Sequence, residues 1–199
     1  MNHNQLLIEA ANSVTKRQRN KPDPNNVVEA LLQAEKAAKK ERHSSNYEQL
    51  IGTWKLCFIT GTKKTRQRAG IVLGSGRYLP SWLTIKLSYS QLNESQAQDK
   101  FTAGKVENTV QFSGLEFSLQ GPVKFLSPKN ILAFDFTQMK VKLFGITFYD
   151  GYIRGGKEAE AIFLQEKIAK QAFFAYFITS DRLIAARGRG GGLALWGKI

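Results

Sequence analysis

The chain of 199 residues has one cysteine, Cys57, and two histidines, His3 and His43. A single thiol cannot form an internal disulfide, and by itself it cannot supply a zinc site. Both histidines lie in the first 50 residues. We therefore expect neither a Ser–His or Cys–His nucleophile pair nor a His-rich metal site in the main body of the chain. The sequence does not suggest an enzyme.

Long apolar runs and cofactor-binding loops are missing as well. No apolar run approaches the ~18 to 20 residues that a membrane-spanning helix requires. The segment from Met1 to Ile8 has no charged start, long apolar stretch or small-residue cleavage site, so we expect no export signal. The segment 74–76 lacks the Gly-Lys-Ser/Thr of a phosphate-binding loop and the third glycine of the dinucleotide fingerprint. We interpret it as a hairpin turn and expect no cofactor and no metal.

Acidic residues are scarce: 16 Asp and Glu stand against 29 Lys and Arg, which gives a net charge of +13. No acidic residue lies between Gly52 and Asn93. An anionic partner is therefore expected, and anionic lipids attract each basic residue near their surface by about 1 kcal/mol. An acidic protein face would be attracted by the same charges. Nucleic acid is the weaker candidate, because few aromatic residues lie nearby to stack on bases. The residues that we expect to dock on an anionic surface are Lys63, Lys64, Arg66, Arg68 and Arg77.

The composition, with 42% hydrophobic residues, is that of a folded globular protein. Apolar spacing near three and four predicts helices over 5–19 and 27–40, with Asn25 or Asn26 as the N-cap of the second. A third short piece follows at 46–50. We therefore divide the chain into an N-terminal helical extension, 1–50, and a β domain, 51–199.

From Gly52 onward the apolar residues alternate with period two, which predicts many short strands. The apolar face switches at Gly114 and again at Gly145, and each switch indicates a bulge or a tight turn. Residues 157–170 favour a short helix. The predicted fold is mainly β, one antiparallel sheet closed or nearly closed into a barrel behind two or three short helices. A barrel of about eight strands is either filled by side chains or able to hold one small ligand.

The chain has 13 phenylalanines, and several occupy apolar strand positions. Each of them could be an ordinary core residue, whereas a hollow barrel would make them the lining of a ligand cavity. The candidate lining residues are Trp82, near the mouth, and Phe112, Phe117, Phe134, Phe136, Phe148 and Tyr152.

Several motifs resemble those of one family. They are Leu50-Ile-Gly-Thr-Trp54 at the start of the first strand, Asp181-Arg-Leu-Ile-Ala-Ala-Arg187-Gly188 near the end, and Gly191-Gly192-Leu193-Ala-Leu-Trp196 after it. The combination is similar to the plastid lipid-associated proteins, or plastid fibrillins, of plastids and cyanobacteria. The resemblance implies a lipocalin-like barrel that binds lipids or prenyl lipids, such as quinones and carotenoids, at thylakoids. The roles that it implies are stress protection, including photoprotection, or prenyl-lipid metabolism.

The resemblance also implies structural roles for Gly52, Trp54 and Arg187 in closing the barrel. By analogy with lipocalins, we expect Trp54 to cap the closed end and Arg187 to lie across its indole ring. The location expected is the cyanobacterial cytoplasm, peripheral on the thylakoid membrane, or a plastid if this is a trimmed plant protein. Two alternatives stay open: a filled barrel that grips a photosynthetic or biosynthetic complex, and a lyase-type enzyme that uses Cys57.

Overall fold

The computed structural model describes residues 3–41, 44–61, 76–92, 97–98 and 101–199. Two helices precede the sheet: α1 (His3–Thr15) and α2 (Pro24–Glu41). The predicted N-cap of α2 is wrong, because the helix begins at Pro24, whose fixed φ suits the first helical position. Asp23 caps the helix instead, since its Oδ1 accepts hydrogen bonds from the backbone N–H groups of Asn25 (2.9 Å) and Asn26 (3.2 Å).

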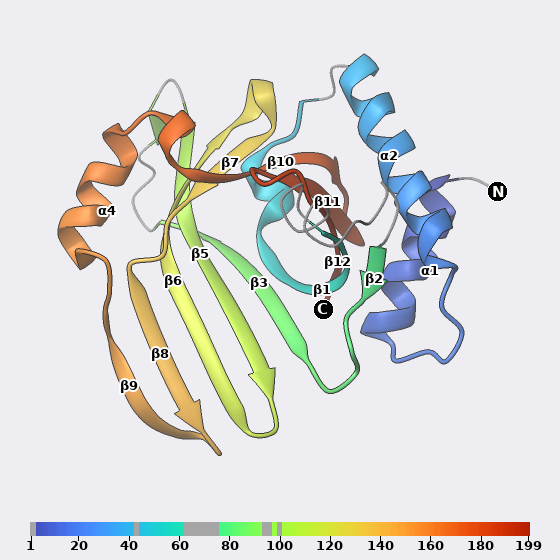
Figure 1. Cartoon of the computed structure of the whole chain (residues 1–199). Helices are drawn as coiled ribbons and strands as arrows, with labels where there is room; N and C mark the ends of the chain where they lie inside the picture. Colours follow the sequence, from blue (N-terminus) through green and yellow to red (C-terminus); the bar gives the residue numbers. More distant parts are fainter. Residues whose placement is uncertain (1–2, 42–43, 62–75, 93–96, 99–100) are drawn as a thin grey trace.

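Eight antiparallel strands close into a barrel, which confirms the predicted fold class (Figure 1). Around the barrel the order is β5, β3, β1, β12, β11, β10, β7 and β6, and β6 pairs with β5 to close it. The bounds are β1 Gly52–Thr60, β3 Thr84–Gln91, β5 Phe101–Phe112, β6 Leu115–Leu126, β7 Ile131–Phe134, β10 Ala172–Thr179, β11 Leu183–Gly188 and β12 Leu193–Lys198.

Four more strands lie outside this closed ring. Strand β2 (Gly76–Tyr78) pairs with β1, and β4 (Ala97–Gln98) pairs with β5. Strands β8 (Gln138–Leu143) and β9 (Ile146–Tyr152) form a hairpin beside β6. Short 3-10 helices, η1 (Tyr47–Leu50), η2 (Ser127–Lys129) and η3 (Ile168–Lys170), and the helix α4 (Gly156–Gln165) complete the described elements.

Strand β6 changes partner along its length. Its residues 123–126 pair with β7 inside the barrel, whereas its residues 115–120 pair with β8. Beyond this fork the strands β3, β5, β6, β8 and β9 form a five-stranded sheet that extends past the barrel, at the lower left of Figure 1. We call this part the open sheet.

Two neighbouring hairpins of the open sheet end in matching turns. The φ angles are 44° and 81° at Ser113 and Gly114, and 47° and 83° at Phe144 and Gly145. Positive φ at both central residues defines the type I′ turn, whose twist fits a two-residue hairpin. The face switches predicted at these two glycines are therefore confirmed as tight turns.

Helices α1 and α2 cover one outer side of the barrel, where they form an apolar core with β1, β11 and β12. The register of β1 against β12 shifts between Leu56 and Phe58, so a β-bulge places Cys57 and Phe58 in this same outer core. Simple alternation along the sequence predicts that Cys57 faces the side of the strand opposite to that of Leu56 and Phe58. For Phe58 this prediction is wrong. Beyond a bulge, parity no longer predicts the face.

Helix α4 is attached to the outside of β6 by Lys124. The Lys124 ammonium donates hydrogen bonds to the carbonyl oxygens of Phe163 (2.9 Å) and Glu166 (2.5 Å) at the end of the helix. Carbonyl groups at a helix C-terminus lack intrahelical partners, and a cation there also matches the helix dipole. Burial lowers the pKa of Lys124. The helix predicted over 157–170 is confirmed in type, and it ends earlier.

Candidate functional site: an apolar sheet face that continues the barrel interior

The closed end of the barrel is filled with side chains. Trp54 and Phe125 have no exposed surface there. The hydroxyl groups of Tyr89 on β3 and Tyr176 on β10 lie 2.7 Å apart across the interior, and burial raises the pKa of both. Helix η1 places Tyr47 in the same core. The described side chains of this end therefore form a packed core.

Trp54 lies in this closed end, and Lys198 covers its ring. The indole Nε1 donates a hydrogen bond to the Leu50 carbonyl at 2.7 Å, and the Lys198 ammonium lies 4.3 Å from the ring centroid. The expected Arg187–Trp54 contact is wrong. Antiparallel pairing of β1 with β12 places Lys198 directly opposite Trp54, and cross-strand neighbours are the residues that meet on one face.

Gly52 belongs to the same end of the barrel. Its φ is 120°, a backbone conformation that residues with a Cβ rarely adopt. A Cβ at this position would also lie 2.8 Å from the Lys198 ammonium. The glycine therefore lets the first strand begin beneath the lysine that covers Trp54.

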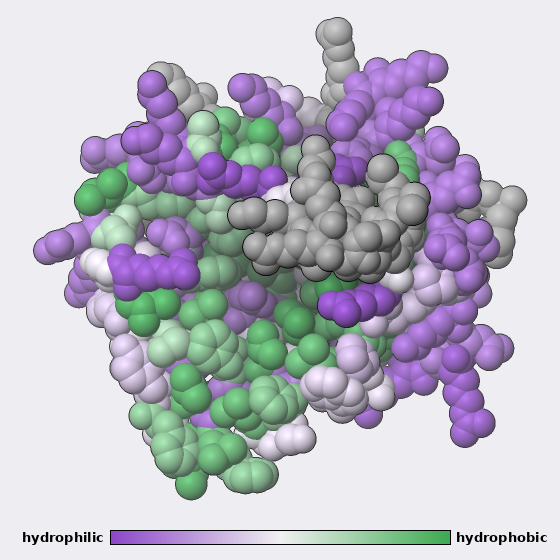
Figure 2. Space-filling view, viewed as in Figure 1, coloured by the Kyte–Doolittle hydropathy of each residue, from purple (hydrophilic) through white to green (hydrophobic). Residues whose placement is uncertain are grey.

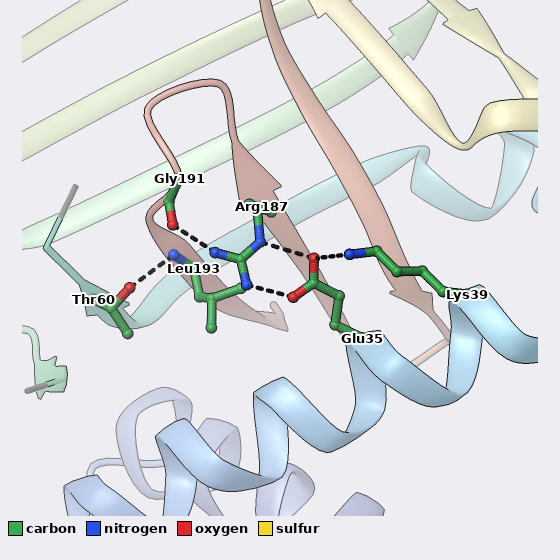
Figure 3. A network of polar contacts seen from close by, with 6 residues as sticks. All are labelled: Glu35, Lys39, Thr60, Arg187, Gly191 and Leu193. Carbon is green, nitrogen blue, oxygen red and sulfur yellow. Dashed lines mark hydrogen bonds and ion pairs between the residues drawn. The ribbon is translucent and has the colours of Figure 1, made fainter. Parts of the chain in front are cut away.

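Arg187 holds helix α2 to the barrel (Figure 3). Its Nε donates to the Glu35 carboxylate at 2.8 Å, its Nη2 donates to the other carboxylate oxygen, and its Nη1 donates to the Gly191 carbonyl at 2.6 Å. Lys39 adds an ion pair to the same carboxylate at 3.0 Å. These hydrogen bonds, led by those from Arg187, lower the pKa of Glu35. Arg187 was expected to close the barrel, and in the structure it attaches helix α2 to the barrel instead.

A layer of aromatic rings lies next to the filled end. Phe174 on β10 stacks on Phe134 with centroids 5.0 Å apart, and Phe134 contacts Phe136 at 5.4 Å. Phe174 also packs edge-on against Trp196, at 5.4 Å. Unlike the closed end, these three phenylalanines are only half-buried. They form the apolar boundary between the filled core and the open sheet.

One face of the open sheet continues the barrel interior. Phe117 on β6 lies opposite Val110 on β5 and Val141 on β8. The registers align further apolar residues in the same way across all five strands. The members of this apolar sheet face are Ile85, Val110, Phe112, Leu115, Phe117, Leu119, Met139, Val141, Leu143, Ile146 and Tyr149.

The opposite face of the open sheet is polar. Lys140 forms an ion pair with Asp150 at 2.8 Å, and Lys142 forms one with Glu116 at 3.2 Å. The alternation along these strands is therefore apolar on one side and charged on the other, as expected for a sheet with one wet face. The apolar side is nevertheless open to solvent, since Phe112, Leu143, Ile146 and Tyr149 are all exposed. Figure 2 shows apolar residues gathered at the lower left, where Figure 1 places β6, β8 and β9.

Six of the seven predicted lining residues divide into four groups. Phe112 and Phe117 lie on the apolar sheet face, and Phe134 and Phe136 lie in the aromatic layer. Trp82 lies just before β3 and is 67% exposed. Phe148 is the extra residue of a β-bulge in β9 and is exposed. The structure therefore brings four of the seven together along one continuous surface.

Tyr152 is the clear error among the predicted lining residues. It lies opposite Gln138, on the polar face, and the Lys157 ammonium lies 6.0 Å from its ring centroid. The bulge in the β8–β9 pairing shifts the register, so alternation counted from Phe148 gives Tyr152 the wrong side.

Most of the predicted docking residues, Lys63, Lys64, Arg66 and Arg68, lie outside the described residues. Arg77 is described, and its side chain is exposed on β2. The described basic residues are numerous on the helical side, where Lys36, Lys39 and Lys40 project from α2.

Three contributors to the interior were absent from the predicted lining: Phe174, Met139 and the Tyr89–Tyr176 pair. The continuous apolar run over 173–178 predicts a buried strand, but it does not indicate which side of the strand Phe174 faces. No local signal predicts the tyrosine pair, because its partners come from strands 87 residues apart in sequence.

Nucleophiles and metal ligands do not gather in the described part of the chain. Cys57 is buried beneath α1, and burial raises its pKa to about 12, so its reactive thiolate does not form at neutral pH. Across the ranges that the structure describes, no three His, Cys, Asp or Glu residues are placed to hold a metal ion. Among the same residues, no helix has the length and apolar character needed to span a bilayer.

No protein-family model matches the chain, and no curated protein matches it. The fold and its exposed apolar face therefore carry the functional argument.

Proposed function

We propose that this protein binds a lipid or prenyl lipid, such as a quinone or carotenoid, on the apolar sheet face. One observation carries the proposal: the interior lining of the barrel continues along β6, through Leu119 and Phe117, onto a sheet face whose outer apolar residues are exposed. Exposed contiguous apolar surface is uncommon on soluble proteins and marks a binding site.

The dimensions suit an elongated apolar molecule. The part of β6 that belongs to the open sheet, residues 115–120, is about 20 Å long at the usual rise per residue. The aromatic layer of Phe134, Phe136 and Phe174 would contact the end of the ligand nearest the filled core. Asn108, opposite Leu119 on the same face, would provide a polar group for a ring carbonyl or hydroxyl. Apolar sites with few polar groups are typical for such ligands.

The biological setting in this proposal rests on the resemblance in sequence. We propose a cyanobacterial-type member of the plastid lipid-associated proteins, peripheral on the thylakoid membrane, or a plastid protein if the chain comes from a plant. The ligand would then serve photoprotection or prenyl-lipid metabolism. The net charge of +13 favours association with anionic thylakoid lipids.

The test is native purification from a photosynthetic host, followed by solvent extraction and mass spectrometry of what co-purifies. We expect one stoichiometric quinone, carotenoid or related lipid. Phe117→Ser, in the centre of the apolar sheet face, should lower the ligand occupancy at least about tenfold. The matched control is Lys140→Ser on the polar face, which should leave occupancy unchanged. Equal occupancy in the two variants would place the ligand elsewhere.

A second candidate function is an assembly or scaffold factor for a photosynthetic complex. The observation in its favour is the filled closed end, with Trp54 and Phe125 fully buried. In that case the apolar sheet face would cover a protein surface. Extraction would then yield no stoichiometric lipid, and cross-linking from Val141 would capture a single protein partner.

A further inference from the structure

The outer end of the open sheet carries large apolar side chains in full contact with solvent. Phe144 is 77% exposed, and Trp82 and Ile146 are each 67% exposed. Phe112 is exposed beside them. We call these four residues the apolar tip.

The residues of the apolar tip lie together although they come from three separate connections. The backbone N–H of Phe144 donates to the Gly114 carbonyl at 2.8 Å, so the two hairpin turns touch. A cleft of about 420 Å³ beside them is lined by Trp82, Phe112 and Gly145. Figure 1 shows the same arrangement, with the ends of β5, β6, β8 and β9 at the lower edge of the molecule.

Phe144 occupies a position that favours another residue. Its φ is 47°, in the left-handed region, where a bulky side chain is disfavoured and Asn, Asp or Gly is preferred. The neighbouring turn has the polar residue Ser113 at the equivalent position. The Phe144 ring lies over Gly114, yet most of its surface stays exposed. Folding therefore gains little from a phenylalanine here, which points to a role in contact with something outside the chain.

Basic side chains surround the apolar tip. Arg17 lines the cleft with Trp82, and so do Lys142 and Glu116. The connection between α1 and α2 adds further exposed basic residues near Arg17. The acidic groups of this region already have partners, since Glu116 pairs with Lys142 and Asp23 caps α2. The basic residues of the connection are Lys16, Arg17, Arg19 and Lys21.

We propose that the apolar tip inserts into the boundary between headgroups and acyl chains of a bilayer that contains anionic lipids. Phe144 and Ile146 enter the acyl region, Trp82 lies at the interface, and Arg17 with the other basic residues of the α1–α2 connection meets the anionic headgroups. Aromatic residues concentrate at this depth, and basic residues strengthen such shallow attachment. The proposal rests on the proposed function, because it names the surface through which the lipid-binding protein meets its membrane. A bilayer with anionic lipids suits the tip better than a second copy would. Two copies in contact through the tip would bring the basic residues of their α1–α2 connections close together.

Trp82 provides a direct test. It is exposed, whereas the other two tryptophans, Trp54 and Trp196, are buried. On liposomes with anionic lipids, acyl chains brominated near the headgroup should quench the Trp82 emission and shift it to the blue. The variant Trp82→Phe should lose this quenchable component. Binding without quenching would overturn the proposal, because the protein would then touch the membrane with another surface.

Paired variants give the second test, by sedimentation of the full chain with liposomes. Phe144→Asn with Ile146→Thr removes the apolar side chains and keeps residues suited to a type I′ turn and a strand. We expect at least about a tenfold weaker partition onto anionic liposomes. The control Ile162→Gln removes an equally exposed isoleucine from α4 and should bind like the parent chain. Equal loss in both variants, or no loss in the tip variant, would overturn the proposal.

Two further readouts separate this proposal from the proposed function. Solvent extraction of the single variant Phe144→Asn should show unchanged ligand content, since Phe144 lies in the turn outside the apolar sheet face. A tip variant that keeps both its ligand and its membrane affinity would refute insertion and leave lipid binding intact. Sedimentation equilibrium without liposomes should show no dimer that the tip variant abolishes. Such a dimer would refute the proposal by assigning the tip to a second copy.

Discussion

Phe125 and Phe117 lie on the same strand, point to the same side of it, and meet opposite environments. Phe125 has no exposed surface and packs in the closed end of the barrel, whereas Phe117 faces the open sheet and is only partly buried. The alternation of the sequence is equally regular around both residues. The difference arises at the fork of β6, where pairing passes from β7 to β8. Hydrophobic alternation therefore selects a face, and the pairing of distant strands decides whether that face is covered.

The largest expected effect comes from the closed end. Phe125→Ala should lower the free energy of unfolding by about 3–5 kcal/mol, because it leaves a cavity in a filled core. Phe117→Ala should lower it by about 1 kcal/mol, since that residue is only partly buried. Urea unfolding followed by tryptophan fluorescence measures both. Equal losses would mean that the open sheet is packed as tightly as the barrel.

The attachment of α2 is the next largest effect. Glu35→Gln should cost about 1–3 kcal/mol of unfolding free energy, because the partly buried Arg187 loses its charged partner. Lys39→Ala should cost about 0.2–0.5 kcal/mol, since the Lys39 side chain is 74% exposed. Thermal unfolding of the two variants measures the contrast. A larger loss for Lys39→Ala would contradict the arrangement of Figure 3.

The same carboxylate makes stability depend on pH. The Arg187 hydrogen bonds hold the pKa of Glu35 below its usual value of 4.5. The unfolded chain therefore binds a proton at Glu35 more readily, so the stabilisation is present above pH 4.5 and is lost as pH falls through the lower folded value. Midpoints of unfolding measured between pH 7 and pH 3 should show this loss in the parent chain. The share of this loss of stability that comes from protonation of Glu35 should be absent in Glu35→Gln.

A small effect of the opposite sign is expected at the apolar tip. Phe144→Asn should raise the free energy of unfolding by about 0.5–1 kcal/mol, because asparagine tolerates positive φ. For a chain of this size the melting temperature would rise by roughly 2–4 °C. Ser113→Asn is the matched change in the neighbouring turn and should have a smaller effect. A destabilised Phe144→Asn variant would show that this ring packs against the fold.

The sequence predicted the elements well because their signals are local. Period two in β5 and β6, the glycines at 114 and 145, and the apolar spacing of α1 and α2 each depend on neighbours in the chain. A β-bulge adds one residue to a strand, so the face predicted by alternation is wrong beyond it, as for Phe58 and Tyr152. The N-cap of α2 is Asp23, two or three residues before the predicted Asn25 or Asn26, which is the usual uncertainty of a helix end.

The candidate site was harder to predict because it depends on contacts between distant strands. Trp54 meets Lys198 through the pairing of β1 with β12, and Arg187 meets Glu35 across 152 residues. The seven predicted lining residues were correctly apolar in type. The sequence could not indicate that β6 forks, and so could not separate Phe134 in the aromatic layer from Phe112 on the exposed face.

The pairing of β1 with β12 also sets an order on folding. Strand β1 begins at Gly52 and β12 begins at Leu193, so one of the seams that close the barrel joins strands about 140 residues apart. Local hairpins such as β5–β6 and β8–β9 form in microseconds, while this seam waits until β12 has been synthesised. Helix α1 waits as well, since it packs on β12. During that interval the nascent chain displays Phe125 as openly as Phe117, and a chaperone would meet one continuous apolar sheet.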